Sequence, residues 1–374
     1  MELSVVIPCL NEEQTIGVCV KKALKSIKTL KIKGEVIVSD NGSVDQSREI
    51  AKKAGALVIR AKEKGYGNAL KKGFDHASGK YMIMGDGDDT YDFLEIPKFY
   101  KKLKDGNDFV MGDRHKKGKI EKGATPLSHK IGVPVLTFIL NHFYNTKISD
   151  SQCGMRGISN ETYKRLNLQT TGMEFASEMI IKASKLKLKI SEVPITLYPR
   201  RGSEAKLHTF QDGWRHLSFM LTQGTNYMFI YPGALIFLFG VLIFILLAPG
   251  QFEIFGRVLH YHVLYIASMI TIAGYNVLMF GLLTKQYSSI EEFTKPDWIT
   301  RFVKKLTLEK ILFSGLFILF ISVILFVYTY IKWQENHFGA LLESGHLILG
   351  LTLFILSIQT IFTGFFSKII ELKK

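Results

Sequence analysis

The sequence predicts two regions: an α/β domain built on a mostly parallel sheet, and after it a four-helix transmembrane region. Strand-like and helix-like segments alternate through the first part of the chain, which is typical of βαβ units. Beyond about residue 225, Leu, Ile and Phe dominate. The chain has 374 residues, of which 47% are hydrophobic, enough for one soluble domain and a further apolar region.

The α/β region consists of apolar runs of strand length, separated by segments whose apolar residues recur at helical spacing. The strand-like runs are LSVVIPCL, EVIVSDNGS, ALVIRAKEKG and KYMIMGDGDD, and the helical segments are NEEQTIGVCVKKALKSI, VDQSREIAKKAG and NALKKGFDHASG. Because strands and helices alternate at this spacing, we expect a parallel sheet covered by helices.

Polar side chains follow three of these strands. They are Asn11 and Glu12 after the first strand, Asp40 at the end of the second, and Asp86 and Asp88 after the fourth. In parallel sheets, ligands bind outside the carboxyl ends of the strands. The sequence therefore predicts an acidic, polar binding site at one edge of the sheet.

The acidic cluster after the fourth strand contains Asp86, Asp88, Asp89 and Asp92, in a chain of formal net charge +15. Neighbouring carboxylates repel one another unless they are protonated or share a cation. A solvated turn is the alternative interpretation, because Asp-Gly is a common turn dipeptide. Oxygen ligands without nearby His or Cys suit Mg²⁺ or Mn²⁺, which bind through one or two carboxylates together with substrate phosphates. We therefore predict a metal site at Asp86 and Asp88 that receives a diphosphate.

Several ordered motifs resemble those of one enzyme family. They are SVVIPCLNEEQTI, VIVSDNGSVDQS, KGYGNALKKGF and the D-x-D at Asp86 and Asp88, followed by DFVMGDRH, ISDSQCGMRGIS, TGMEFASEMIIKA and SEVPITLYPRRGSEAKL. Over residues 3–210 the chain resembles the family-2 glycosyltransferases, which have a Rossmann-like GT-A fold. The later motifs are similar to the branch that makes polyprenyl-phosphate sugars, namely the dolichyl-phosphate mannose and glucose synthases and their bacterial undecaprenyl-phosphate relatives.

The resemblance implies transfer of a hexose from a nucleotide-diphosphate sugar to polyprenyl phosphate, with Mg²⁺ or Mn²⁺ as cofactor. It also implies roles for individual residues. Pro8, Asn11 and Glu12 border the nucleotide, and Asp40 contacts the base and ribose. Asp86 lies near the sugar and ribose.

The remaining implied roles concern charge on the phosphates. Asp88 coordinates the metal, while Arg114 and Arg156 surround the sugar diphosphate and the acceptor phosphate. Arg200 and Lys206 belong to the motif just before the membrane segment. Three positions depart from the family pattern: Ser39 replaces an aspartate, Thr90 replaces a frequent glutamine, and Ala205 replaces a serine. These departures leave open the sugar and the choice between UDP and GDP.

The sequence contains no evident catalytic base, since its ten histidines are scattered. A phosphate monoester has a second pKa of about 6, so at neutral pH the acceptor is already a deprotonated nucleophile. A metal at Asp88 can stabilise the leaving diphosphate, and arginines can position the acceptor. We therefore predict direct in-line displacement, with inversion at the anomeric carbon.

Four windows without Asp, Glu, Lys or Arg are long enough to cross a bilayer. They are residues 228–248, 262–284, 311–331 and 346–366. Lys and Arg concentrate in the segment between the second and third windows, whereas the loops on the opposite side hold only Arg257 and Lys332. The positive-inside rule then predicts a multi-pass membrane protein whose catalytic domain and both termini are cytoplasmic.

The predicted domains are a catalytic domain at 1–209, an interfacial juxtamembrane segment at 210–227 and a transmembrane domain at 228–374. The juxtamembrane segment carries Trp214, Arg215 and His216 beside an apolar face, as expected of a helix at the headgroup boundary. The apolar segment 131–144 is compatible with a core helix, while the family resemblance favours a helix at the membrane surface.

Two other functions are compatible with parts of the sequence. A processive polysaccharide synthase would share the catalytic fold, but such enzymes usually carry a Q-x-x-R-W motif, and the nearest match here is QDGWR. A catalytically dead, membrane-anchored binding or scaffold protein is the second alternative. The retained motif aspartates and arginines argue against it.

Composition excludes further classes of function. Cys9, Cys19 and Cys153 have no C-x-x-C spacing, which argues against a disulfide framework and a structural zinc site. Anionic lipids and basic loops account for much of the positive charge, and no motif resembles a nucleic-acid-binding one. We therefore expect a nucleotide sugar, a polyprenyl phosphate and the lipid bilayer as partners, and no nucleic acid.

Overall fold

The computed structural model describes residues 1–201, 209–247, 252–254, 257–259, 262–290, 298–303, 305–339 and 344–372. The chain divides into two compact units, Met1–Met220 and Leu221–Lys374.

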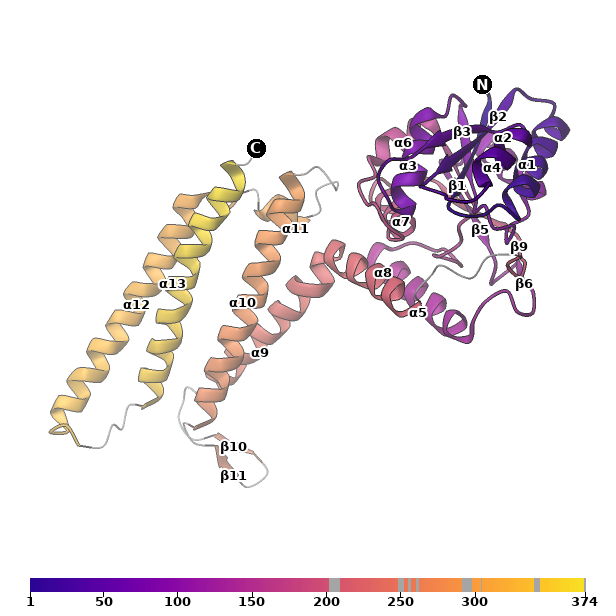
Figure 1. Cartoon of the computed structure of the whole chain (residues 1–374). Coiled ribbons are helices and arrows are strands. Elements are labelled where there is room, and N and C mark those ends of the chain that lie inside the picture. The colour runs from indigo at the N-terminus through magenta and orange to yellow at the C-terminus, as the bar shows by residue number, and fades with distance from the viewer. Residues whose placement is uncertain are drawn as a thin grey trace. The chain divides into compact units, whose positions relative to one another are not determined.

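The first unit is built on a seven-stranded sheet with the strand order β3-β2-β1-β4-β7-β5-β8 (Figure 1). The strands are β1 (Leu3–Cys9), β2 (Gly34–Asp40), β3 (Leu57–Arg60), β4 (Tyr81–Met84), β5 (Phe109–Asp113), β7 (Arg156–Ser159) and β8 (Ile190–Pro194). β7 runs antiparallel to its neighbours β4 and β5, and the other pairs are parallel. The predicted mostly parallel α/β sheet is confirmed.

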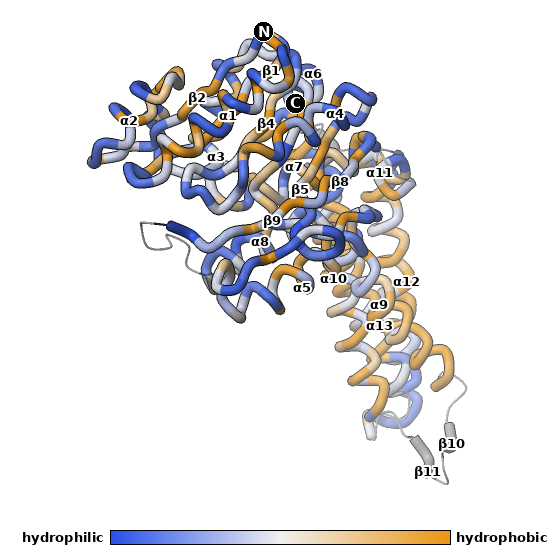
Figure 2. The backbone as a smooth tube through the Cα atoms, turned by 90° about the vertical axis from the view of Figure 1, so that its right-hand side faces the viewer, coloured by the Kyte–Doolittle hydropathy of each residue, from blue (hydrophilic) through white to orange (hydrophobic). Residues whose placement is uncertain are grey.

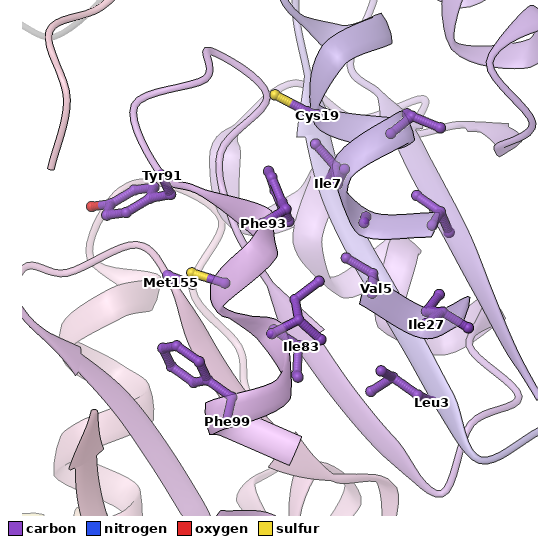
Figure 3. Packing of buried hydrophobic residues seen from close by; sticks show 14 of the residues in the cluster. Leu3, Val5, Ile7, Cys19, Ile27, Ile83, Tyr91, Phe93, Phe99 and Met155 are labelled. Atoms are coloured by element: carbon purple, nitrogen blue, oxygen red, sulfur yellow. The ribbon is translucent and has the colours of Figure 1, made fainter. Parts of the chain in front are cut away.

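Helices cover both faces of this sheet. They are α1 (Ile16–Leu30), α2 (Ser47–Lys53), α3 (Tyr66–His76), α4 (Ile96–Lys104), α6 (Asn160–Leu166) and α7 (Phe175–Lys185). Successive side chains of a strand point to opposite faces. Leu3, Val5 and Ile7 of β1 therefore enter one hydrophobic cluster with α1 and α4, while Val6 enters a second cluster with α3 and α7. Figure 3 shows the first cluster, with Phe93 packed among the aliphatic side chains.

Smaller elements complete this unit. They are η1 (Phe93–Glu95), the paired short strands β6 (Lys119–Ile120) and β9 (Thr196–Leu197), and the helices α5 (Leu127–Tyr144) and α8 (Thr209–Gln223). Leu140 of α5 and Met220 of α8 are buried in the second cluster. Elsewhere α5 exposes Ile131, Val135 and Phe138. The segment predicted as either a core or a surface helix therefore packs on the core and also presents apolar side chains outward.

Among the described residues of the second unit, four helices are long and apolar enough to cross a membrane. Its elements are η2 (Asn226–Ile230), α9 (Tyr231–Leu247), β10 (Phe252–Ile254), β11 (Arg257–Leu259), α10 (His262–Ile290), α11 (Trp298–Val303), α12 (Leu308–Glu335) and α13 (Ser344–Leu372). The first predicted window begins in η2 and continues through α9, and its last residue, Ala248, lies outside the described residues. The other three windows fall on α10, α12 and α13. Figure 2 shows the predominantly hydrophobic colouring of these helices.

Close backbone approach and polar pairs hold these helices together. A side chain at Gly233 of α9 would lie 2.6 Å from the backbone nitrogen of Leu278 on α10, so the contact requires glycine. Between α10 and α13, the hydroxyl groups of Ser268 and Thr352 are 2.7 Å apart. Small residues and interhelical hydrogen bonds are the contacts that associate helices within a bilayer.

Candidate active site

A cavity of about 380 Å³ lies at the carboxyl ends of β1 and β4 in the first unit. Its walls come from these strand ends, the start of α3, the loop before α7, and α8. The lining residues are Pro8, Cys9, Leu10, Glu12, Asn41, Gly65, Tyr66, Ala69, Asp86, Gly87, Asp88, Gly172, Met173, Arg200, Gln211, Asp212 and Arg215. Among the residues predicted from sequence, the structure brings together Pro8, Glu12, Asp86, Asp88 and Arg200.

The four aspartates after β4 divide into two pairs with different partners. Asp86 and Asp88 line the cavity. Asp89 instead binds the ammonium group of Lys22 on α1 at 2.7 Å, and Asp92 lies 3.6 Å from the same group. The backbone at Asp89 has a φ of 59°, in the left-handed region that aspartate tolerates. The cluster therefore supplies two carboxylates to the cavity, and the other two pair with a helix.

Asp86 carries a carboxyl group with a raised pKa. Burial, followed by repulsion from Asp88, raises the pKa of Asp86 to about 7. The hydroxyl group of Tyr66, at the start of α3, donates a hydrogen bond to Asp86 Oδ1 at 2.9 Å. A cation bound nearby would favour the ionised form of this carboxyl group.

Arg200 connects the ends of two strands across the cavity. Its Nη2 donates to Glu12 Oε1 at 2.5 Å, and its Nη1 lies 3.3 Å from Asp88 Oδ2. The other carboxylate oxygen of Asp88 accepts hydrogen bonds from the backbone N–H and the hydroxyl of Thr90, at 3.1 and 2.6 Å. Thr90, one of the departures from the family pattern, thus orients the carboxylate of Asp88.

The donor set at Asp86 and Asp88 fits a hard divalent cation that binds together with a diphosphate. Across the described part of the chain, no three His, Cys, Asp or Glu side chains are grouped to hold a metal ion. Two carboxylates suffice for Mg²⁺ or Mn²⁺ when substrate phosphates and water supply the other ligands. The residues present therefore suit a metal that arrives with its nucleotide.

Asp40 and Asn11 organise the loop after β2 and do not line the cavity. Asp40 is fully buried and accepts hydrogen bonds from two backbone N–H groups of that loop, at 3.3 and 3.1 Å. Asn11 accepts another from the same loop at 2.9 Å. The loop presents Asn41 to the cavity, and its side-chain oxygen accepts a hydrogen bond from the backbone N–H of Gly65 at 2.7 Å.

Arg114 forms a buried ion pair with Asp150, and its role beside the substrate phosphates stays a prediction. Its Nε and Nη2 donate to the two carboxylate oxygens of Asp150, at 2.5 and 2.8 Å, and its Nη1 donates to the hydroxyl of Tyr91 at 3.2 Å. Figure 3 shows the Tyr91 hydroxyl directed away from the aliphatic side chains. Burial alone would raise the pKa of Asp150, but the charge of Arg114 lowers it. Arg114 is not among the cavity-lining residues.

Arg156 is also absent from the residues that line the cavity, and its role at the phosphates stays a prediction. It opens β7, a central strand of the sheet, and is 1% exposed. Its three guanidinium nitrogens donate to the backbone carbonyls of Cys153, Ala176 and Ser151. An arginine at the start of a central strand has no route to solvent, so it satisfies its donors inside the domain.

Sequence reasoning missed other parts of the cavity wall. Tyr66 belongs to the KGYGNAL motif, which indicated only a loop. Asp212 and Arg215 lie in the segment that we predicted as interfacial. Lys206 lies outside the described residues, so its predicted role stays a prediction.

Two sequence models match separate parts of the chain. Residues 4–166 match the model described as glycosyl transferase family 2, and residues 282–371 match the C-terminal transmembrane region of the same family. The chain is also 36% identical over 365 residues to the low-salt glycan biosynthesis hexosyltransferase Agl6 of Haloferax volcanii. That alignment covers 97% of this chain and 87% of the relative. The chain belongs to glycosyltransferase family 2.

Further similarities of this family 2 glycosyltransferase are more local. It is 32% identical over 215 residues to a dolichyl-phosphate hexose transferase of Haloferax volcanii, covering 57% of this chain and 89% of that protein. A solved glucosyl-3-phosphoglycerate synthase from Mycobacterium tuberculosis, bound to Mn²⁺ and UDP-glucose, is 21% identical with a TM-score of 0.48. That match covers 60% of this chain and 79% of the other. The prediction of a glycosyltransferase with a membrane region is confirmed.

Proposed function

We propose that this glycosyltransferase moves a hexose from a UDP- or GDP-sugar to polyprenyl phosphate, with inversion at the anomeric carbon and with Mg²⁺ or Mn²⁺ as cofactor. The observation that carries the proposal is the single cavity that joins Asp86 and Asp88 with Arg200 at the ends of β1 and β4. The relative named a dolichyl-phosphate hexose transferase supports the choice of acceptor.

The proposed chemistry exchanges one bond at the anomeric carbon. An oxygen of the acceptor phosphate forms a bond to that carbon, while the bond to the nucleoside diphosphate breaks and its electron pair leaves with the diphosphate. The acceptor is already ionised at neutral pH, so no residue needs to remove a proton. A metal held by Asp86 and Asp88 would neutralise charge on the leaving diphosphate.

The residues of this chain hold and orient the reactants. Thr90 fixes Asp88 through two hydrogen bonds, and Tyr66 fixes Asp86 through one. Arg200, which contacts Glu12 and Asp88, supplies a permanent positive charge at the same place. Fixed charges near the breaking bond stabilise the transition state without needing to reorganise.

The membrane arrangement that we propose follows the charge of the loops. Basic residues between the second and third spans favour a cytoplasmic position for that loop, the catalytic domain and both termini. We place the catalytic domain at 1–209, an interfacial segment at 210–227 and the membrane domain at 228–374. The exposed apolar residues of α5 support contact of the catalytic domain with the bilayer surface.

A transfer assay with the full-length protein in lipid nanodiscs tests the proposal. Labelled UDP- and GDP-hexoses are supplied with polyprenyl phosphate and Mg²⁺ or Mn²⁺. The expected product is a lipid carrying one sugar, and chelation of the metal abolishes it. A polymer would indicate a processive synthase instead, and the absence of any product with every sugar would indicate a binding protein.

A matched pair of variants tests the role of the cavity carboxylates. Asp88→Asn removes a cavity charge, whereas Asp92→Asn changes the same cluster outside the cavity. We expect Asp88→Asn to lower kcat by about 10²–10³-fold, the range seen when one charge-stabilising group is removed. Asp92→Asn should stay within about threefold of the native enzyme. Equal activity of both variants would refute the site.

A further inference from the structure

The cavity wall contributed by α8 is fixed to the first unit. His216 is buried, and its Nδ1 lies 2.8 Å from the hydroxyl oxygen of Ser177 on α7. Met220, also buried, has a backbone carbonyl that accepts a hydrogen bond from the hydroxyl of Tyr144 on α5, at 2.5 Å. These contacts lie on the side of α8 that packs on the domain, so the cavity-lining residues of α8 have defined positions.

Two of the lining residues are permanently charged cations, Arg200 and Arg215. Arg200 is engaged by Glu12 and Asp88, and its side chain is 22% exposed. Arg215 has a side chain that is 61% exposed, and its Nη1 lies 3.6 Å from the carboxylate of Asp212, one turn earlier on α8. The two arginines therefore stand in different surroundings, one among the strand ends and the other on a helix at the wall.

The phosphate group of the acceptor lipid is anionic, so its binding needs a cation at the cavity. The ends of β1 and β4 contribute carboxylates there. The lining includes the acidic residues Glu12, Asp86, Asp88 and Asp212, which repel a phosphate dianion where they are ionised. Arg114 and Arg156 are not among the lining residues, and protein oxygens already accept hydrogen bonds from all their guanidinium nitrogens. A guanidinium group with several donors in one plane can bind two phosphate oxygens together.

We propose that Arg215 binds the phosphate group of the acceptor lipid and that Asp212 orients its guanidinium group. This assignment rests on the proposed function, and it adds a positioning residue that lies on α8 rather than in the strand-end motifs. Arg200 then serves the diphosphate of the donor, and Arg215 serves the acceptor. Arg215 lies on α8, the last α-helix before Asn226, where the first candidate span begins.

The test separates acceptor binding from donor binding in the full-length enzyme. Arg215→Ala and Arg215→Lys are compared with Arg165→Ala, which removes the same charge from an exposed position on α6 outside the cavity. We expect Arg215→Ala to raise the KM for polyprenyl phosphate by about tenfold, the effect of losing one charge-assisted hydrogen bond. Arg215→Lys should recover part of this loss, and Arg165→Ala should match the native enzyme.

Two further readouts keep the result specific. The KM for the nucleotide sugar, and the thermal midpoint of unfolding, should stay unchanged in Arg215→Ala. Asp212→Asn should raise the acceptor KM in the same direction but less. An acceptor KM equal to that of Arg165→Ala, or a rise in donor KM alone, would overturn the proposal for Arg215 while leaving the transfer reaction intact. If the native enzyme transfers no sugar to polyprenyl phosphate, the proposed function itself fails.

Discussion

Two pairs of arginines in the first unit differ in their surroundings. One pair comes from the sequence motifs and is buried, and the other pair lines the cavity. Arg114 directly follows β5 and Arg156 opens β7. They are 9% and 1% exposed, and each donates from every guanidinium nitrogen to a protein oxygen. Arg200 and Arg215 lie beyond the last strand of the sheet and line the cavity. The two arginines next to or within the sheet satisfy their donors inside the domain, whereas the two beyond the last strand lie at the cavity, where we propose that they meet the substrates.

Removal of the Arg114 ion pair should have the largest effect on stability. Arg114→Met leaves Asp150 buried without its cation, and loss of one partner of a buried pair costs about 3–5 kcal/mol. We expect the free energy of unfolding of the catalytic unit to fall by this amount, measured by denaturant or thermal unfolding in detergent. Asp150→Asn should destabilise in the same direction. Unchanged stability in both variants would show that Arg114 is not a structural residue.

His216 responds to the charge of the buried Arg156. Burial, and then the charge of Arg156, lower the pKa of His216 to about 4. Above pH 6.5 the side chain is neutral in both the folded and unfolded states, so it has no effect on stability. As the pH falls from about 6.5 to about 4, only the unfolded state takes up the proton, and stability falls by up to about 3 kcal/mol.

The measurement compares unfolding of the native enzyme and of His216→Asn at a series of pH values. We expect the native protein to lose stability relative to its value at pH 7, with the steepest slope between pH 6.5 and 4. The variant should lack this component of the slope. Parallel curves for the two proteins would mean that His216 titrates normally in the folded state.

The fold was predictable because its signals are local. The apolar run of β1 predicts a strand buried on both faces. Because successive side chains of a strand point to opposite faces, Leu3 and Val6 enter different clusters. The four membrane windows follow from their length and composition. Asp86 and Asp88 follow the end of β4, and this position predicts that they line a binding cavity, as they do.

The site was less predictable where long-range packing decides it. Arg114 and Asp150 are 36 positions apart, and nothing in either motif indicates that they pair. Arg215 enters the cavity wall only because His216 and Met220 anchor α8 to the domain. Motif order identifies the residues that the family shares, while the pairing between distant segments decides which side chains remain at the cavity.

Arg200 provides the smallest expected effect on stability and the sharpest contrast with Arg114. Its contacts with Glu12 and Asp88 are part of the cavity, and its side chain is 22% exposed, against 9% for Arg114. We expect Arg200→Gln to change the free energy of unfolding by no more than about 1 kcal/mol. Turnover should nevertheless fall by at least about tenfold, because the variant loses the charge that we propose for binding the donor diphosphate. Unfolding and transfer assays on the same preparation decide the matter, since a loss of stability as large as that of Arg114→Met would place Arg200 with the structural arginines.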